Sequence, residues 1–516
     1  MTRQSFIKGT MILLGAGIFN RILGFVPRIA LPRIVGAEGV GLYQMGYPFL
    51  IVVLTVITGG IPLAVAKLVA EAQGDVRRAR KVLGTALSIT VSLGALFTLA
   101  SLLLSEWIVS RLFTDDRVHL TFVAMSPIIL MAGVSAVLRG YFQGLHNMLP
   151  TAYSQVTETL LRIVAVLFLA WLLLPRGVHA AAAGAMAGVA VGELGGLIVL
   201  IRQYAAERKR RTAQNPGGTA TRGGAGVLRR LMSVSIPVTA GRLVGSSSYF
   251  LESVLIVQSL AAAGVMTAVA TAQYGALQGM VMPILLLPTA LTYSLAVSLV
   301  PSLSEAAGRR DLGTVNKRIH QSLRLALIAG GPFAATIYVL AGPICQFVYN
   351  DPQAGTMLRA MAPAALFIYA QGPLQAALQA LDMPGIALRN TFIGACAKLA
   401  LIALLASNPA YGIMGAIAAI NVNIVLVTAL HWLAIGRTMK FPLSAAEMLK
   451  YAAALAFTAF AAKIAWDHPL FGNEALRLAA ALAAGFAAYF ASCAGLGLID
   501  RHDAARVLML GKKIVK

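Results

Sequence analysis

Residues 411–435 have the sequence YGIMGAIAAINVNIVLVTALHWLAI, which contains no Asp, Glu, Lys or Arg. A run of about 20 apolar residues can cross the hydrocarbon core of a bilayer as a helix. Similar runs recur along the 516-residue chain, in which 58% of the residues are hydrophobic and only 12% are charged. Soluble domains carry about 25% charged residues. The composition therefore predicts an all-α integral membrane protein.

Hydropathy over windows of about 19 residues predicts about fourteen membrane-spanning helices. The predicted cores are residues 7–31, 45–69, 82–104, 120–142, 154–174, 179–201, 231–257, 271–300, 322–341, 356–381, 388–406, 411–435, 448–466 and 474–498. Two prolines, Pro283 and Pro288, interrupt the long segment 271–300 and predict a bend there.

Basic residues predict the orientation of these helices, because Lys and Arg are retained in short cytoplasmic loops. With the amino terminus inside, most of the 42 Lys and Arg residues fall on the inner side, including those of 77–81, 208–211 and 512–516. The pattern predicts a multi-pass plasma-membrane protein with both termini in the cytoplasm. It also accounts for the net charge of +23 without a nucleic-acid partner.

Short matches in the same order indicate an internal duplication of six helices. The matched stretches are 21–24 (RILG) with 242–245 (RLVG), 63–65 with 295–297 (both LAV), and 143–146 (QGLH) with 379–382 (QALD). An even repeat keeps both copies in the same orientation, and such parallel halves enclose a central cavity in several transporter folds.

This duplication predicts four parts of the chain. Residues 1–205 form an amino-terminal six-helix bundle, and residues 229–440 form a second one. Residues 206–228 lie between the two bundles, are rich in Gly, Thr and Ala, and are expected to be a flexible cytoplasmic linker. Residues 441–516 supply two additional helices and a basic cytoplasmic tail. The protein is expected to be a monomer surrounded by membrane lipids.

Arginines inside predicted spans are the main candidates for a binding site, because intramembrane charges are costly and usually functional. Arg21 and Arg28 lie seven residues apart on one helix face, and Arg242 is the repeat counterpart of Arg21. One guanidinium group can bind two phosphate oxygens at once. The three arginines therefore predict a phosphate or diphosphate site. Alternatively, each arginine pairs with an acid or reaches the membrane surface, as expected for the local pair Glu158 and Arg162.

The acids within the spans are fewer. Glu193 and Glu252 are candidates for coupling transport to a proton or sodium gradient or to the membrane potential, or for balancing a nearby arginine. Asn20 and Lys398 are further candidates for a cavity lining. No His, Cys or Asp cluster has the spacing of metal ligands, so no metal or other cofactor is expected. No loop is long enough for a catalytic domain, which argues against an enzyme.

Four stretches near the amino terminus resemble the stage V sporulation protein B family. They are 6–10 (FIKGT), 20–25 (NRILGF), 36–43 (GAEGVGLY) and 67–72 (KLVAEA). That family belongs to the multidrug/oligosaccharidyl-lipid/polysaccharide exporter superfamily, which includes the lipid II flippases. The resemblance implies two six-helix bundles in a V shape, alternating access, and a lipid-diphosphate-linked saccharide as substrate. A peptidoglycan or polysaccharide precursor fits this description, and the sporulation branch implies a role in spore cortex synthesis.

Lipid II flippases carry functional arginines in their first helix, and Arg21 matches the first of them. Arg28 lies one residue later than the family pattern, and Ile29 follows it where the pattern has an acid. The alternative function within the superfamily is a multidrug/cation antiporter. A cavity for cationic drugs should favour acids, whereas arginines outnumber carboxylates in these spans.

Overall fold

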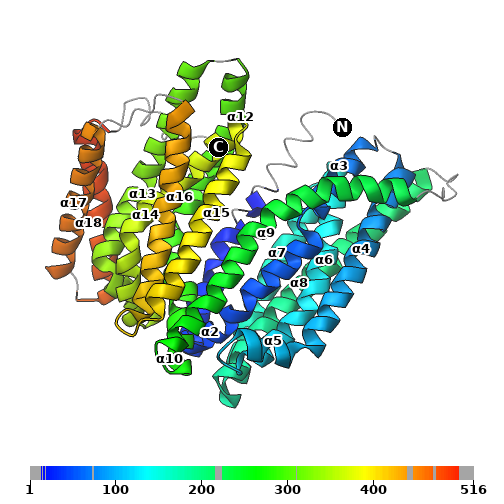
Figure 1. Ribbon diagram of the computed structural model, residues 1–516, viewed down its shortest axis with the longest axis horizontal. Helices are drawn as coiled ribbons and strands as arrows, with labels where there is room; N and C mark the ends of the chain where they lie inside the picture. The colour runs from blue at the N-terminus through cyan, green and yellow to red at the C-terminus, as the bar shows by residue number, and fades with distance from the viewer. Residues whose placement is uncertain are drawn as a thin grey trace. The chain divides into compact units, whose positions relative to one another are not determined.

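The computed structural model describes residues 13, 15–17, 19–72, 75–214, 224–309, 311–438, 445–468 and 472–498. These residues are overwhelmingly helical and contain no β-strand, which confirms the all-α prediction (Figure 1). The elements are α2 (Phe25–Thr58), α3 (Ile61–Glu71), α4 (Val76–Leu103), α5 (Ser105–Leu112), α6 (Val118–Gly144), α7 (Leu149–Leu173), η1 (Leu174–Arg176), α8 (Val178–Gln214), α9 (Gly224–Ala262), α10 (Thr267–Gly275), η2 (Ala276–Val281), α11 (Met282–Leu286), α12 (Thr289–Gly308), α13 (Leu312–Tyr349), α14 (Gln353–Ala380), α15 (Pro384–Leu401), η3 (Ile402–Ala406), α16 (Gly412–Thr438), α17 (Ala445–Asp467) and α18 (Glu474–Gly495).

Twelve helical stretches of the described residues are long and apolar enough to cross a membrane. The first, Gly15–Glu71, has 57 residues and contains two predicted segments, of which 7–31 lies partly outside the described residues. Helix α14 coincides with the predicted segment 356–381 but is not one of the twelve. The multi-span membrane fold is thus confirmed, whereas the number of about fourteen crossings stays a prediction.

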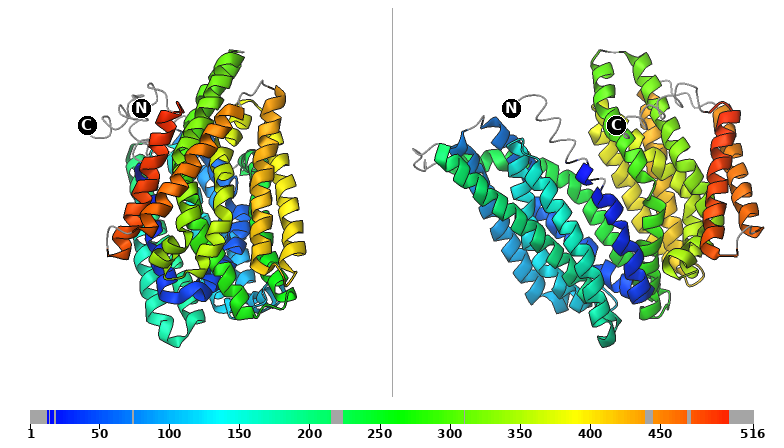
Figure 2. Two further views of the ribbon diagram at one scale, coloured as in Figure 1. Left: turned by 90° about the vertical axis from the view of Figure 1, so that its left-hand side faces the viewer. Right: turned by 180° about the vertical axis from the view of Figure 1, so that it is seen from behind.

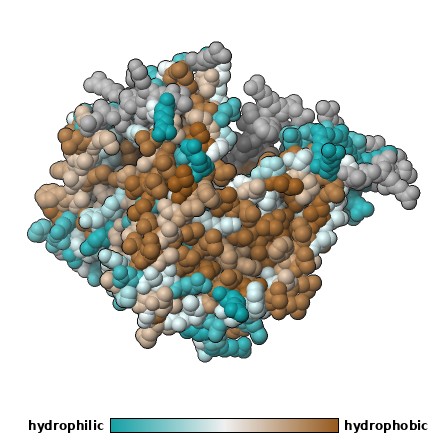
Figure 3. Space-filling model, in the orientation of Figure 1, coloured by the Kyte–Doolittle hydropathy of each residue, from teal (hydrophilic) through white to brown (hydrophobic). Residues whose placement is uncertain are grey.

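Apolar side chains face outward along these helices, as they do in proteins surrounded by lipid. The stretch Leu149–Arg176 has a mean hydropathy of 2.0, yet only 17% of its most apolar window is buried. Val164 and Trp171 are 68% and 63% exposed. Figure 3 shows hydrophobic side chains along the flanks of the amino-terminal helices and hydrophilic side chains near their ends. Water would penalise this surface, whereas hydrocarbon accommodates it.

The chain forms two compact units. The first contains residues 1–279 and 402–413, and the second contains residues 280–401 and 414–516. Helices α9 and α10 therefore pack with the amino-terminal helices. Helix also extends into both ends of the predicted linker 206–228, because α8 ends at Gln214 and α9 begins at Gly224. The rest of that linker, residues 215–223, lies outside the described residues, and the predicted bundle boundaries stay a prediction.

Glycines hold α7 and α8 in close contact within the first unit. Gly184, Gly188, Gly192 and Gly196 recur every four residues on one face of α8. A Cβ atom at Gly188 would lie 2.4 Å from the backbone nitrogen of Val166, so only hydrogen fits there. Small residues at this spacing let helix backbones approach closely inside a membrane.

Two interruptions divide the long amino-terminal helical stretch. Gly36 adopts φ 68° and ψ −179°, a conformation that penalises other L-residues, and it separates residues 25–35 from 37–58 of α2. Gly59 and Gly60 then separate α2 from α3. The helical stretch therefore consists of three pieces, and the helix axis can change direction at each of the two breaks.

The predicted proline-containing segment 271–300 is divided into several helical elements, whereas its predicted bend stays a prediction. Helix α10 passes into the π-helical turn η2, after which Pro283 lies in the first turn of α11 and Pro288 precedes α12. Proline removes a backbone donor and clashes with the preceding turn. Its two occurrences account for the short length of α11.

The second unit has a core of small and aliphatic residues from α12 to α16. Helices α17 and α18 run beside each other, as Figures 1 and 2 both show, and they pack on α13. The Tyr489 hydroxyl of α18 donates a 3.0 Å hydrogen bond to the carbonyl of Leu327 in α13. The ring fits because Gly331 has no side chain at that point. The two carboxy-terminal helices are thus fixed on the second unit.

Candidate functional site

The first unit contains a cavity of about 230 Å³ between α2, α7 and α8. Its lining residues are Gly24, Pro27, Arg28, Leu31, Pro32, Val40, Tyr43, Gln44, Tyr47, Thr159, Arg162, Ile163, Val166, Val189 and Gly279. The polar members gather on α2 and α7, and the aliphatic members close the remainder. The cavity therefore combines an apolar wall with hydrogen-bond donors, as small ligand sites usually do.

Two arginines, Arg28 from α2 and Arg162 from α7, line this cavity. The Arg28 guanidinium lies 5.8 Å from the centre of the Phe25 ring. Tyr43, Gln44 and Tyr47 lie in the same lining. Two positive forks with neighbouring hydroxyl and amide donors can bind an anion bearing several oxygen atoms.

Arg162 belongs to a chain of charges that runs from the cavity into the helix packing. Glu158 Oε1 accepts a 3.1 Å hydrogen bond from Arg162 Nη1, and Glu158 Oε2 accepts a 2.7 Å hydrogen bond from Arg139 Nη2. Arg139 Nε also donates to Ser154 Oγ at 3.2 Å. The predicted local pair of Glu158 and Arg162 is confirmed. Its extension to Arg139 on α6 is a contact between helices that the spacing within α7 does not reveal.

Glu193 lies on α8 beside this chain of charges and is 8% exposed. It interacts electrostatically with Glu158, Arg139 and Arg162. Its Oε1 atom is buried and, among the described residues, accepts no hydrogen bond. A buried carboxylate in this position can take up a proton or balance the arginines, the two roles that the sequence left open.

The other predicted arginines lie outside the cavity lining. Arg21 is exposed and precedes α2, and the Oδ1 atom of the neighbouring Asn20 is buried without a hydrogen-bond partner in the described part of the chain. Arg242 Nη1 donates a 2.6 Å hydrogen bond to the carbonyl of Gly59, at the break between α2 and α3. Arg242 therefore has a structural contact in this conformation.

Glu252 and Lys398 occupy different units. Glu252, on α9, is 7% exposed and accepts a 3.2 Å hydrogen bond from Gln278 Nε2. Lys398, on α15, is buried in the second unit. The first unit thus brings Arg28 and Glu193 near one charge network, and it places Glu252 in a separate polar contact.

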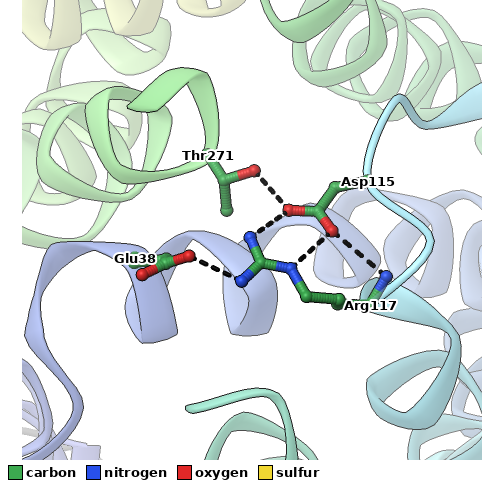
Figure 4. A network of polar contacts seen from close by, with 4 residues as sticks. All are labelled: Glu38, Asp115, Arg117 and Thr271. Atoms are coloured by element: carbon green, nitrogen blue, oxygen red, sulfur yellow. Dashed lines mark hydrogen bonds and ion pairs between the residues drawn. The ribbon is translucent and has the colours of Figure 1, made fainter. Parts of the chain in front are cut away.

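A second polar network, which sequence analysis did not identify, joins three segments of the first unit (Figure 4). Arg117 binds Asp115 through Nε at 2.9 Å and Nη2 at 2.8 Å. Arg117 Nη1 also contacts Glu38 Oε1 on α2 at 2.7 Å. Thr271 Oγ1 of α10 donates to Asp115 Oδ2 at 2.8 Å. The one signal for it in the sequence is the polar run 114–117 (TDDR) between two apolar segments.

The carboxyl group of Asp115 is only 3% exposed, and burial by itself would raise its pKa. Hydrogen bonds from Arg117 and Thr271 outweigh burial and hold the pKa of Asp115 below its usual value. The same hydrogen bond from Arg117 to Asp115 raises the pKa of the Arg117 guanidinium. Both groups are therefore charged at neutral pH, and the network ties α2, α10 and the loop before α6 together.

The fold defines the class of protein: a multi-pass membrane protein with the fold of solved transporters of the MOP superfamily. The model of the polysaccharide biosynthesis protein family matches residues 6–307, and the model of the MatE family matches residues 243–404. Stage V sporulation protein B of Bacillus subtilis (strain 168) is 38% identical over 519 residues, with 100% of each chain covered. The chain belongs to the polysaccharide biosynthesis family, together with stage V sporulation protein B.

More distant relatives share the same fold. Lipid II flippase MurJ of Bacillus subtilis (strain 168) is 27% identical over 419 residues, which cover 77% of each chain. The solved structure titled lipid II flippase MurJ, inward closed conformation, has a TM-score of 0.71 at 15% identity and covers 93% of this chain and 98% of its own. An inward-facing multidrug resistance MATE family transporter has a TM-score of 0.64 at 15% identity, over 83% and 97% of the two chains.

Proposed function

We propose that this protein is a flippase that moves a lipid-diphosphate-linked saccharide from the inner to the outer leaflet by alternating access. The observation that carries the proposal is Arg28, an intramembrane arginine on the wall of a cavity in a protein of this family. Similarity to one relative, lipid II flippase MurJ, supports the substrate class. The name of another, stage V sporulation protein B, supports a role in spore cortex peptidoglycan.

The chemistry of the substrate explains why arginine is needed. A diphosphate diester carries negative charges that strongly oppose entry into hydrocarbon, and an arginine fork replaces water as its hydrogen-bond donor. Of the three arginines predicted from the sequence to bind the substrate, Arg28 is the one that lines the cavity. Arg21 and Arg242 are proposed to contact the same headgroup at other stages of transport, when their exposed or backbone-bound guanidinium groups are re-aimed.

Energy for transport is proposed to come from an ion gradient or the membrane potential rather than from a bound cofactor. Glu193 and Glu252 are buried carboxylates within spans and are the proposed ion-coupling groups. Asn20 and Lys398 remain proposed contributors to a cavity lining. The protein is proposed to act as a monomer in the plasma membrane, with both termini in the cytoplasm and without enzymatic activity.

A multidrug/cation antiporter is the second candidate, favoured by the MatE match over residues 243–404 and by buried Glu252 within it. The two functions differ in the charge of the cargo. Binding of a cationic dye that depends on Glu252, with no binding of an anionic lipid, would support the antiporter and contradict the flippase.

The direct test is lipid translocation in liposomes that contain the purified full-length protein and fluorescent lipid II. We expect translocation that responds to an imposed proton or sodium gradient or membrane potential. Substitution Arg28→Ala should slow it by about tenfold or more, because one charge-assisted contact contributes about 1.5–3 kcal/mol. Arg176→Ala, at an exposed arginine outside the cavity, is the matched control. Equal rates for the Arg28 variant and the wild type would contradict the proposed site.

A further inference from the structure

We propose that Arg162 is a second phosphate-binding residue of the cavity and that Glu158 is the positioning residue that aims it. This inference rests on the proposed function, since it names the part of the site that would contact the second phosphoryl group. Arg28 and Arg162 come from α2 and α7, yet both line one cavity, together with Tyr43. Two forks on one small chamber match the two phosphoryl groups of a diphosphate.

The exposure of the charged side chains shows which of them faces the cavity. Arg162, which lines the cavity, has a side chain that is 35% exposed, whereas the side chains of Glu158 and Arg139 are 12% and 20% exposed and lie outside the lining. Arg162 is therefore the accessible end, whereas Arg139 and Glu158 are the interior support. A guanidinium has five N–H donors, and the contact with Glu158 engages Arg162 through Nη1. Further donors of the same fork can bind a ligand.

The charge balance of this cluster favours an anion. Glu158, whose carboxylate contacts Arg162, also binds Arg139, so it neutralises neither arginine completely. Even with Glu193 ionised, the guanidinium groups of Arg28, Arg139 and Arg162 outnumber the two carboxylates. An arginine held by a shared carboxylate is oriented but still electropositive, which is the state that a phosphate ligand needs.

The backbone beneath Arg162 is fixed as well. A Cβ atom at Gly192 of α8 would lie 2.5 Å from the Cβ atom of Arg162, so α8 packs directly against the base of this side chain. Gly196 allows the same approach at Glu158, where the corresponding distance is 3.0 Å. Preorganised side chains bind with a smaller loss of conformational entropy.

The size of the cavity also favours a small ligand group. Its volume of about 230 Å³ is below the roughly 300–1,000 Å³ of pockets for drug-sized ligands, so the cavity fits a diphosphate rather than a whole saccharide.

The experiment compares binding of two lipids to the full-length protein in nanodiscs: a polyprenyl diphosphate saccharide and the matching monophosphate saccharide. The wild type should prefer the diphosphate. Arg162→Gln should weaken diphosphate binding by about tenfold while it changes monophosphate binding little, so the preference collapses. Arg162→Lys, which keeps the charge and the pair with Glu158 but loses the fork, should retain part of the preference.

Glu158→Gln tests positioning, and Glu158→Asp tests rescue. The glutamine should lower the preference for the diphosphate, and the aspartate should restore part of it; a purely structural role would weaken both lipids equally. Arg176→Gln is the matched control on the exposed turn after α7. Thermal unfolding of each variant identifies a folding defect, and Arg162→Lys then provides the decisive comparison.

An unchanged preference in both Arg162 variants overturns this inference alone, provided that the wild type binds and translocates the diphosphate lipid. A wild type that binds neither lipid overturns the proposed function together with the inference. Loss of preference in Arg176→Gln to the same extent as in Arg162→Gln also contradicts a specific role for Arg162.

Discussion

Thr271 Oγ1 donates a 2.8 Å hydrogen bond to Asp115 Oδ2, although 156 positions separate the two residues. The bond fastens the middle of α10 to the loop before α6, and Arg117 Nη1 extends the connection to Glu38 Oε1 of α2 at 2.7 Å. Three segments that are distant in sequence are thus joined through Arg117 and the buried Asp115 carboxylate. Residues of α2 that line the cavity lie on both sides of Glu38, from Pro27 to Tyr47.

Substitution Thr271→Val should destabilise the protein by about 1–2 kcal/mol, because the buried Asp115 carboxylate loses a hydrogen bond while the shape of the side chain is kept. Thermal unfolding in detergent measures the effect. Thr267→Val is the matched control, since Thr267 is exposed at the first position of the same helix. Equal melting temperatures for the two variants would show that the bond contributes nothing.

The stability of the protein should depend on pH through Asp115, whose pKa is lowered by hydrogen bonds from Arg117 and Thr271 that outweigh its burial. A carboxyl group with a lowered pKa stabilises the fold above its unfolded pKa of about 3.9. That contribution is lost as the pH falls through the folded pKa. The wild type should therefore lose more stability on acidification below about pH 4 than Asp115→Asn does. Parallel acid unfolding curves for the two proteins would contradict this expectation.

Substitution Gly188→Ala should loosen the contact between α7 and α8 and cost about 1–3 kcal/mol, as insertions into tightly packed positions do. The added Cβ would lie 2.4 Å from the Val166 nitrogen. Gly84→Ala on α4 is the control, because no atom lies within 4 Å of its added Cβ and alanine favours helix. Gly188→Ala should lower the melting temperature, and Gly84→Ala should raise it. If Gly188→Ala also raised the melting temperature, packing at Gly188 would not be tight.

Arg242 can be tested for two roles at once. Arg242→Ala removes the 2.6 Å bond to the Gly59 carbonyl and should lower both stability and lipid translocation. Arg242→Lys keeps a donor for that carbonyl but not the fork, so we expect it to restore the melting temperature without restoring translocation. Full recovery of translocation in the lysine variant would show that Arg242 serves only the break between α2 and α3.

The sequence supports the membrane fold because the cost of polar groups in hydrocarbon leaves a signal in every span, such as residues 411–435. The interruption of the helix near Pro283 and Pro288 was equally predictable, since proline acts on its own helix. The pair of Glu158 and Arg162 was predictable for the same reason, because it lies within one turn of α7.

Contacts between helices left no such signal. Arg139 of α6 pairs with Glu158 of α7, and Asp115 accepts a hydrogen bond from Thr271, which lies 156 positions further along the chain. Their partners depend on how helices pack, which hydropathy does not encode. The assignment of Arg242 shows the same difficulty: its repeat position suggested a ligand contact, and the Gly59 carbonyl that it binds is 183 positions away.

Gly36 lies between Arg28, which faces the cavity, and Glu38, which Arg117 holds. Its φ of 68° places it in a region that glycine adopts without penalty, and no atom within 4 Å would meet an added Cβ. The non-helical conformation of this one residue lets the two pieces of α2 differ in direction. The piece before Gly36 can thus place Arg28 on the cavity wall, while the piece after it places Glu38 against Arg117.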